Sequence, residues 1–325
     1  MLADVARLAG VSPITASRVV NGGQSVSEAT RARVLEAIDA LGYRGNAAAR
    51  ALAGGRSRTI GVVGSQTGFY GPMRTLVGIE AAARRADHAV SFVTLERPER
   101  DEVVAALDRL AESHADGAIV IAPLDATVGA LGELEHPLPF VVTSAFDARH
   151  AGVSIDQRAG ARLATAHLLE LGHRTVHHVA GPSGWHDASA RRDGWQIELR
   201  SRRIRPPAVV VGDWTAESGY AAGRRLAREA EVTAVFAAND QMALGVLAAM
   251  REAGRDVPGD VSVVGFDDIA EAAYFAPALT TIRQDLAALG TRSVEMLLAV
   301  LAGEAAQQVE IAPELVVRRS AGPPS

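Results

Sequence analysis

The chain has 325 residues, 48% of them apolar and 22% charged, which is enough for two or three folding units with ordinary cores. It contains no cysteine, which excludes disulfides, thiolate catalysis and zinc sites built on sulfur. No apolar stretch approaches the roughly 20 residues of a membrane-spanning helix, and the first residues lack a secretory signal pattern. We therefore expect a cytoplasmic protein with no membrane partner.

The formal charge of −5 is unevenly distributed along the chain. Residues 1–58 contain Arg7, Arg18, Arg31, Arg33, Arg44, Arg50, Arg56 and Arg58 against Asp4, Glu28, Glu36 and Asp39. This head therefore carries +4, whereas the rest of the chain carries −9. A basic head on an acidic body indicates a nucleic-acid partner for the head alone.

Three short helices are predicted in the head. The first covers Ala3–Ala9; the second begins at Pro13, with Ser12 as its cap, and ends near "NGG". Ser27 caps a third, which places Val34, Ile38 and Leu41 on one face. Two helices joined by a glycine-containing turn predict a helix-turn-helix unit, whose second helix enters the major groove of DNA. The residues expected in its core are Ala6, Val11, Val19 and Leu41.

From Thr59 onward, short apolar strands alternate with amphipathic helices. The predicted strands are "TIGVVGS", "VSFVTL", "GAIVIA", "FVVTS", "VSID", "TVHHVAG", "AVVVGDW", "AVFAAND" and "VSVVGFDD". The clearest helices between them cover residues 72–87, 99–113 and 125–134. This alternation is typical of an α/β fold with doubly wound parallel sheets, and its length favours two lobes over one.

Ligands of such sheets bind outside the carboxyl ends of the strands. Several predicted strands end in side chains that can form hydrogen bonds or stack, namely Ser65, Ser144, Trp214, Asn239, Asp240, Asp267 and Asp268. We expect these side chains to converge at the mouth of a cleft.

Long motifs resemble those of the lactose and galactose repressor family. "DVARLAGVSPITASRVVNG" looks like its DNA-binding head and "NAAARALAGGRS" like its hinge helix, while "GDWTAESGY", "AANDQMALG", "VSVVGFDD" and "LTTIRQD" resemble its sugar-binding body. The resemblance covers nearly the whole chain. It implies a helix-turn-helix domain over 1–45, a hinge helix and linker over 46–58, and a ligand-binding and dimerisation domain over 59–325. Lobe 1 of that domain would take about 59–155 and 285–312, and lobe 2 about 156–284 and 313–320.

Arg18 is the predicted base-reading residue, because an arginine can bond both acceptors on the major-groove edge of guanine. A phosphate contact or a solvated side chain is the alternative. Pro13 and Ile14 match family positions that select the operator, and their apolar side chains suit thymine methyl groups. The residues expected to anchor phosphates or cap helices are Ser12, Thr15, Ser17 and Asn21.

The hinge over residues 46–54 has Asn46 as a possible cap and strong helix formers after it. So short a helix is marginal in water, and we expect it to form only on DNA. By resemblance, Leu52 of each subunit inserts into the minor groove at the operator centre. An alanine-rich linker without DNA contacts is the alternative.

The cleft candidates at strand ends follow from their chemistry. We expect Asn239 to contact the ligand and Asp240 to cap the helix that follows. Asp267 can accept hydrogen bonds from two sugar hydroxyls, whereas Asp268 either joins the site or braces the following loop. Gln284, at an expected crossover between the lobes, could reach the cleft. Phe69 and Ser144 complete this part of the predicted site.

The segment "PSGWHDASARRDGW", residues 182–195, supplies the other candidates. We expect a loop through Trp185 and Asp187 and a helix from about Ala188. By resemblance, Arg191 binds sugar hydroxyls and Asp187 is a nearby polar contact; a solvated Arg191 is the alternative. The flat Trp185 suits the apolar face of a pyranose ring, or else packs against the cleft wall.

The other two tryptophans are expected to have different roles. We expect Trp195 to pack in the core and Trp214 to lie in the pocket. His177 and His178 alternate faces of one strand, which argues against joint metal ligation and favours structural roles. No cofactor or metal is expected.

Three departures from the family pattern bear on the expected assembly and ligand. The chain begins almost at its first helix, without the few basic residues that usually precede it, so we expect a start that is either truncated or misassigned. It lacks the C-terminal heptad helix of a tetrameric family member, so we expect a homodimer. Ser144 stands where that member has an acidic sugar contact, so the ligand should be held differently.

The resulting hypothesis is a sugar-responsive transcriptional repressor. A homodimer would bind a palindromic double-stranded DNA operator, and a mono- or oligosaccharide inducer would release it. A corepressor-dependent regulator of the same family and a sugar-binding transport protein are the alternatives. An enzyme is not expected, because the body offers no serine elbow, metal cluster or glycine-rich phosphate loop.

Overall fold

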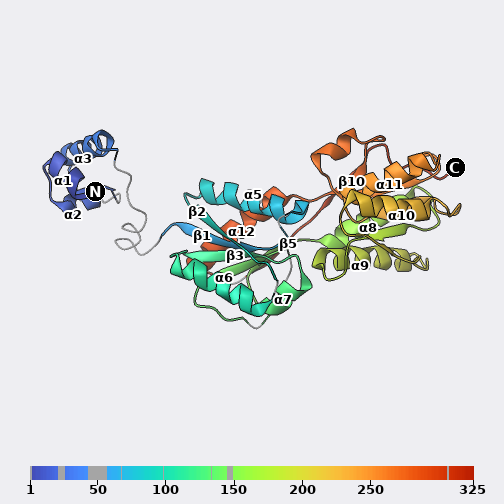
Figure 1. The fold of residues 1–325 in the computed structure, drawn as a ribbon, viewed down its shortest axis with the longest axis horizontal. Helices are drawn as coiled ribbons and strands as arrows, with labels where there is room; N and C mark the ends of the chain where they lie inside the picture. Colours follow the sequence, from blue (N-terminus) through green and yellow to red (C-terminus); the bar gives the residue numbers. More distant parts are fainter. Residues whose placement is uncertain are drawn as a thin grey trace.

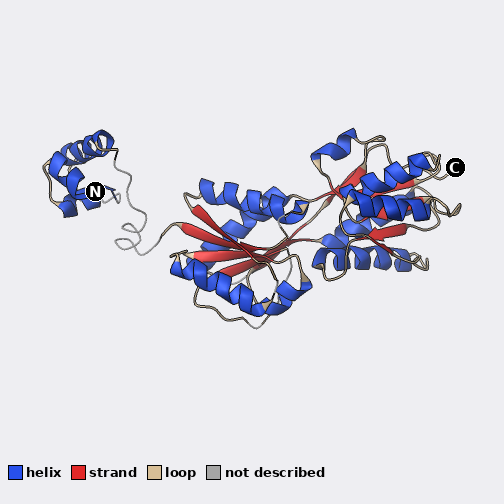
Figure 2. Ribbon diagram, viewed as in Figure 1, coloured by secondary structure: helices blue, strands red, loops and turns tan. Residues whose placement is uncertain are grey.

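The structure is a computed structural model that describes residues 2–20, 26–42, 57–66, 68–97, 99–132, 134–144, 149–305 and 307–325. The predicted DNA contacts Asn21, Asn46 and Leu52 lie outside these ranges. Figure 1 shows a small helical head and two α/β lobes that lie end to end. Helices flank the strands of each lobe (Figure 2).

The head contains the three predicted helices, α1 (Leu2–Ala9), α2 (Pro13–Val20) and α3 (Glu28–Ala40). The Ser12 hydroxyl accepts a hydrogen bond from the Thr15 amide, and the Ser27 hydroxyl accepts one from the Thr30 amide, so both predicted caps are confirmed. Small side chains let the helices cross closely; the buried core is Val5, Ala6, Ala9, Ala16, Val19, Val34 and Ala37. The expectation that Leu41 is core is wrong, because it is the C-cap of α3 and 47% exposed.

Lobe 1 is a parallel sheet in the order β11-β5-β4-β3-β1-β2. Its strands are β1 (Thr59–Gly64), β2 (Ala89–Thr94), β3 (Gly117–Ile121), β4 (Phe140–Thr143), β5 (Gly152–Ile155) and β11 (Gln308–Ile311). Its helices are α5 (Tyr70–Arg85), α6 (Arg100–Glu112), α7 (Asp125–Leu131) and α12 (Leu286–Leu301). Both faces are covered, because Val62 packs towards α5 and α12 whereas its neighbour Val63 packs towards α6 and α7.

Lobe 2 has the sheet order β12-β10-β9-β8-β6-β7, parallel except for the β10–β12 pair. Its strands are β6 (His177–Ala180), β7 (Val210–Val211), β8 (Ala234–Ala237), β9 (Ser262–Asp267), β10 (Thr280–Arg283) and β12 (Glu314–Val316). Its helices are α8 (Gln157–Glu170), α9 (His186–Ser201), α10 (Ala216–Leu226), α11 (Asp240–Glu252) and the short 3₁₀ helix η1 (Ala270–Tyr274). One core lies under α8 and α9 and a second under α10 and α11. The doubly wound α/β prediction is confirmed.

The chain passes between the lobes three times. It leaves lobe 1 after β5, returns between β10 and α12, and leaves again between β11 and β12. The backbone amide of Asp156, in the first crossover, donates at 3.0 Å to the carbonyl of Ile311, the last residue of β11 before the third crossover. The antiparallel pairing of Arg283 with Glu314 joins the second crossover to the third.

Two predicted elements are shorter in the structure. The helix expected over 125–134 ends at Leu131, because Gly132 is its C-cap and the Leu134 amide turns back onto the Leu131 carbonyl. The strand expected in "AVVVGDW" reduces to the two residues of β7. That strand lies at the sheet edge with β6 as its only partner, so little pairing holds it in extended form.

Candidate functional site

A cavity of about 270 Å³ opens between the two lobes, at the carboxyl ends of their strands. The predicted ligand contacts that line it are Phe69, Trp185, Asp187, Arg191, Trp214, Asn239, Asp267 and Gln284. Phe69 comes from lobe 1, Gln284 lies in the second crossover, and the others come from lobe 2. These residues are thus brought together from widely separated parts of the sequence.

Ser144 does not line this cavity. It lines a smaller neighbouring cavity of about 20 Å³, which it shares with Asp187, Gln157 and Gln284. That volume is enough for a single water molecule. Ser144 therefore lies next to the main cavity. It could affect a ligand in the main cavity only indirectly, through Asp187, Gln157 or Gln284.

Aromatic rings form one side of the cavity. The Trp185 ring meets Phe69 edge-on with centroids 5.1 Å apart, and it meets Trp214 edge-on at 5.5 Å. Gly181 makes room for Trp214, because a Cβ atom at that position would lie 2.2 Å from the indole. Edge-to-face packing of this kind leaves ring surface open to the cavity while fixing the orientation of each ring.

Arg191 projects from α9 and is only 4% exposed, so the alternative of a solvated side chain is wrong. Its Nε atom donates to Oε1 of Gln157 at 2.9 Å, and its guanidinium also donates to the carbonyl of Ala238. The guanidinium carbon lies 3.8 Å from the centre of the Phe266 ring and its Nη1 atom lies 3.6 Å from Oδ1 of Asp267. These contacts hold a cation rigidly at the cleft.

Asp267 ends β9 and is 6% exposed. Burial raises its pKa to about 6, although the Arg191 charge and a hydrogen bond from Gln284 act in the opposite direction. Gln284 donates that bond from Nε2 at 2.7 Å, and its Oε1 atom accepts from Nε2 of Gln157 at 2.7 Å. Asp268 does not line the cavity; it pairs instead with Arg283 of β10 and with Arg318, which follows β12.

Asp187 lies in the first turn of α9, which begins at His186. The helix therefore begins two residues earlier than expected, at His186 rather than near Ala188, and Trp185 is its N-cap. The Oδ1 atom of Asp187 is buried and has no hydrogen-bond partner in the parts of the chain that the structure describes. Burial raises the pKa of this carboxyl, and the neighbouring Arg191 opposes the shift.

The cap of α11 is Asn239, so the expectation that Asp240 caps this helix is wrong. Asn239 is the helix cap, accepting from the Met242 amide at 2.9 Å and donating to the Trp214 carbonyl at 3.0 Å. Asp240 turns inward and accepts from the hydroxyl of Thr281 at 2.6 Å. Asn239 still lines the cavity, where it fixes the backbone of Trp214.

Three predicted site residues have left-handed backbone conformations that side chains other than glycine rarely adopt. The φ angles are +81° at Ser144, +74° at Trp214 and +115° at Asp267. Asp267 ends β9, Ser144 directly follows β4, and Trp214 comes three residues after β7, so all three lie where the chain turns at the carboxyl end of the sheet. Such strain persists only where the surrounding structure holds it, and it gathers at ligand sites.

The structure adds cavity residues that sequence reasoning missed, chiefly Gln241, Tyr70 and Thr215. The Oε1 atom of Gln241 and the Nε1 atom of Trp214 are buried and lack partners within the described ranges. Gln241 occupies the first turn of the helix after a strand end, as Asp187 does. A polar residue in the first turn of a helix that follows a strand is the sequence feature from which Gln241 could have been predicted.

The second helix of the head presents the predicted base-reading residues to solvent. Pro13, Ile14 and Arg18 are exposed, Ile14 to 66%. Ile14 and Arg18 are four residues apart and therefore share one face of α2. Ser12 and Thr15 bond each other at the start of this helix, with hydroxyl oxygens 2.9 Å apart, while Ser17 is half-buried.

The remaining tryptophan and histidine expectations concern structure. Trp195 is fully buried and donates from Nε1 to the Val176 carbonyl at 2.8 Å, so its core role is confirmed. His178 is fully buried against Phe236, and burial lowers its pKa to about 4. Across the described ranges, no three acidic, histidine or cysteine side chains gather as around a metal ion, and no helix could cross a membrane.

A helix-turn-helix head joined to a two-lobed α/β body with a cleft between the lobes defines the class, a ligand-responsive DNA-binding regulator. Residues 1–46 match the family model described as bacterial regulatory proteins, lacI family, and residues 165–321 match a periplasmic binding protein-like domain. The lactose operon repressor of Escherichia coli K12 is 36% identical, over 98% of this chain and 89% of that protein. The chain belongs to the lacI family.

Other relatives and solved structures agree. The transcriptional regulator CelR of Thermobifida fusca is 34% identical over 97% of this chain and 96% of that protein. A lac repressor dimer bound to operator and the anti-inducer ONPF superimposes with a TM-score of 0.90 at 34% identity, covering 99% of each chain. A CelR–cellobiose complex gives a TM-score of 0.72 at 31% identity, covering 98% of this chain and 99% of that one.

Proposed function

We propose that this chain is a repressor that binds a palindromic operator as a homodimer and is released by a mono- or oligosaccharide bound in the cleft. The observation that carries the ligand half is a cavity between the lobes whose polar lining is incompletely paired. Three lining residues, Asp187, Gln241 and Trp214, each hold a buried polar atom (Oδ1, Oε1 and Nε1) that has no hydrogen-bond partner among the residues that the structure describes. Buried polar atoms without partners are costly, so a bound molecule should supply those hydrogen bonds.

The chemistry of these atoms favours a molecule rich in hydroxyl groups. Asp187 and Gln241 need donors whereas the Trp214 indole needs an acceptor, and a hydroxyl group provides both. The open ring surface of Trp185 suits the apolar face of a sugar ring. Arg191, Asn239, Asp267 and Gln284 add further polar groups to the lining of the cavity. A relative's complex with cellobiose supports the same class of ligand.

The DNA half rests on the exposed face of α2. Arg18 would read a guanine, with Pro13 and Ile14 in contact with thymine methyl groups. Ser12, Thr15, Ser17 and Asn21 would anchor phosphates, Asn46 would cap the hinge helix, and Leu52 would enter the minor groove. An operator-bound dimer of a family member supports this arrangement. A repressor of bacterial genes would act in the cytoplasm.

A thermal-shift screen of lactose, galactose, cellobiose and glucose tests the ligand half, because a molecule that binds the folded state raises the melting temperature. Binding to a selected palindromic duplex is then measured with each sugar that shifts it. The proposal expects at least one sugar to weaken duplex binding. A sugar that strengthens it would indicate a corepressor instead, and a purine that binds where no sugar does would overturn the ligand class.

Fluorescence locates the sugar in the cleft. Because Trp195 is buried in the core, only Trp185 and Trp214 can respond directly to a molecule in the cavity. A stacked sugar should change the emission of the native protein, and Trp185→Phe should remove most of that change. An unaltered response in Trp185→Phe would place the sugar away from this ring.

A further inference from the structure

Four buried side chains beside the cleft form a closed ring. Arg191 donates to Gln157 at 2.9 Å, Gln157 donates to Gln284 at 2.7 Å, and Gln284 donates to Asp267 at 2.7 Å. The Oδ1 atom of Asp267 lies 3.6 Å from Nη1 of Arg191, which closes the ring. All four side chains are at most 8% exposed.

The chemistry of the two ends fixes the direction of every hydrogen bond in the ring. A guanidinium only donates and an ionised carboxylate only accepts. Gln284 must therefore turn its amide nitrogen to Asp267 and its oxygen to Gln157, which must in turn give its own oxygen to Arg191. Rotating either amide by 180° would set two acceptors or two donors against each other, so the ring permits one arrangement.

Gln157 differs from the other three members in its position. Arg191, Asp267 and Gln284 line the main cavity, whereas Gln157 lines only the small cavity behind it. Gln157 is also the first residue of α8, directly after the first crossover between the lobes. It therefore joins side chains that face the ligand to a backbone segment that does not.

All three crossovers are connected at this level of the molecule. The bond from Gln157 to Gln284 links the first crossover to the second, and the Asp156 amide links the first to the third. The β10–β12 pairing links the second to the third. Arg191 and Asp267 are thus joined by hydrogen bonds to the chain segments that connect the lobes.

We propose that Gln157 is a positioning residue that ties the ligand-facing pair Arg191–Asp267 to the lobe crossovers, so that the arrangement of the lobes follows the occupancy of the cleft. The effector half of this inference rests on the proposed function. The other half, that Gln157 fixes the arrangement of the lobes, concerns the protein without any sugar. The two halves are tested separately.

Two variants separate the possible roles of Gln157. Gln157→Leu removes both of its bonds in a side chain of similar size. Gln157→Glu keeps an acceptor for Arg191 but cannot donate to Gln284, so it cuts only the link to the second crossover. Gln196→Leu is the matched control, because Gln196 lies half-buried on α9, the helix that carries Arg191.

The first experiment measures the distance between the lobes without sugar. The chain has no cysteine, so Glu112→Cys in lobe 1 and Glu217→Cys in lobe 2 give two unique spin-label sites. Both native side chains are exposed. We expect Gln157→Leu and Gln157→Glu to shift or broaden the distance distribution, with the control unchanged. Wild-type distributions in both variants would overturn the proposal, and a change in Gln157→Leu alone would reduce Gln157 to a support for Arg191.

The second experiment measures coupling, using whichever of lactose, galactose, cellobiose and glucose binds most tightly. Coupling is the ratio of duplex affinities with and without saturating sugar, and a purely structural support would lower sugar affinity without changing that ratio. We expect Gln157→Glu to reduce it by about three- to tenfold, the equivalent of one hydrogen bond, while its sugar affinity stays within about twofold of wild type. Wild-type coupling in both Gln157 variants would overturn the proposal. If no sugar binds, the proposed function fails and the distance measurement decides the structural half alone.

Discussion

At the scale of single residues, Asp187 lines the cavity and has a buried carboxylate oxygen without a partner in the described part of the chain. Its pKa is raised because burial disfavours the charged form, and Arg191 compensates only in part. A carboxylate held in this way destabilises the protein without ligand. A ligand that donates a hydrogen bond to it removes this cost, so the bond contributes strongly to the affinity. Stability and affinity should therefore change in opposite directions when the charge is removed.

We expect Asp187→Asn to raise the free energy of unfolding at pH 7 by about 1 kcal/mol and to weaken sugar binding about tenfold. Denaturant melts and calorimetric titration measure the two quantities. Asp193→Asn, at an exposed position on the same helix, is the control and should change neither. Unchanged sugar affinity in Asp187→Asn would remove Asp187 from the site.

Asp267 predicts a pH dependence of stability. Its pKa of about 6 in the folded protein exceeds the ordinary value of 3.8, so the folded state binds the extra proton between these limits. Its contribution to stability is therefore highest below pH 3.8, falls as pH rises to about 6, and is constant above. The melting temperature of wild type minus that of Asp267→Asn should decrease from pH 4.5 to 6.5. A constant difference would contradict the raised pKa.

Arg18 predicts a loss of sequence selectivity. Arg18→Ala should weaken operator binding by about 1–3 kcal/mol and relax the preference at one base pair of each half-site, because a guanine contact discriminates between bases. Selection of duplexes from a randomised palindrome measures this. If affinity fell equally for all duplexes, Arg18 would be a phosphate contact, which was the alternative reading.

At the scale of secondary-structure elements, glycines set how closely the helices of lobe 2 approach. A Cβ atom at Gly245 of α11 would lie 2.0 Å from the carbonyl oxygen of Ala216 and 2.4 Å from the amide nitrogen of Tyr220 in α10. Backbone cannot yield as a flexible side chain would, so these two helices must separate if the residue is enlarged. By contrast, a Cβ at Gly129 of α7 meets nothing within 4 Å.

These two glycines should respond oppositely to the same substitution. Gly245→Ala should destabilise the protein by about 1–3 kcal/mol through overpacking, whereas Gly129→Ala should stabilise it by about 0.5–1 kcal/mol through helix propensity. Chemical denaturation of both variants is the measurement. A neutral Gly245→Ala would mean that α10 and α11 can separate at little cost.

The elements that sequence reasoning predicted best were those with strong local signals. The head helices have caps at Ser12 and Ser27, and the alternation of strands with helices is clear from β1 to β9. The errors fell where tertiary contacts decide. Asn239 and Asp240 are both good caps, and the hydrogen bonds that Thr281 and the Ile269 amide donate to Asp240 decide which of them turns inward.

The ring around Gln157 shows the limit of such prediction more clearly. Gln157 and Gln284 are separated by most of lobe 2 in sequence, and nothing local in "VSIDQRAG" indicates that their amides meet. The family resemblance identified residues that line the cavity. It carried no information on a residue behind them whose function is mechanical.

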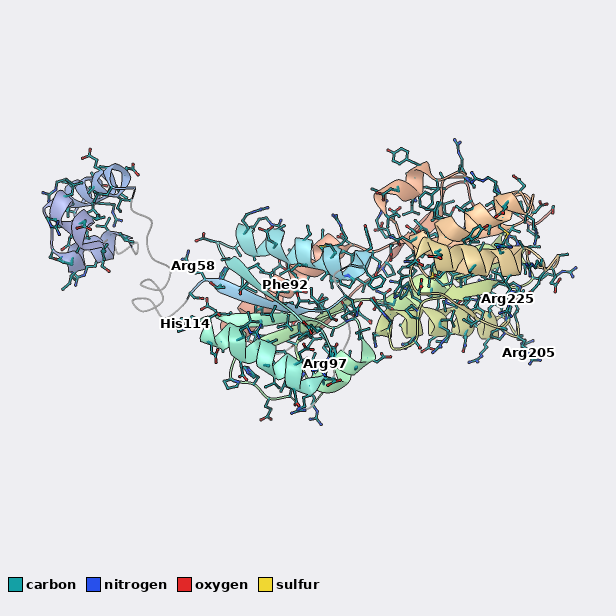
Figure 3. The ribbon with its side chains drawn as sticks, viewed as in Figure 1. Arg58, Phe92, Arg97, His114, Arg205 and Arg225 are labelled. Atoms are coloured by element: carbon teal, nitrogen blue, oxygen red, sulfur yellow. The ribbon has the colours of Figure 1, made fainter. Side chains whose placement is uncertain are left out.

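At the scale of the whole molecule, charge separates the two functional ends. The head carries a formal charge of +4 and the rest of the chain −9. The arginines of the acidic body include Arg205 and Arg225, whose side chains point outward from lobe 2, away from the other lobe (Figure 3). Association with DNA through the head should therefore be strongly screened by salt, because bound phosphates release counterions.

Operator affinity should fall by at least about tenfold between 50 and 200 mM salt, since several phosphate contacts are expected. Fluorescence anisotropy with a labelled duplex measures this, and sugar binding over the same range serves as the control because a neutral ligand releases no counterions. Salt-independent duplex binding would contradict docking through the basic head.

The three crossovers also determine when this protein can become native during its synthesis. The lobe 1 sheet needs β11 and its core needs Val294 and Leu297 of α12, yet both are made after nearly all of lobe 2. The edge of the lobe 2 sheet in turn needs β12, which comes later still. Although proteins usually fold their N-terminal domain first on the ribosome, neither lobe of this nascent chain is complete until its last residues emerge. Both lobes are therefore completed only when the segment from α12 to β12 has been made.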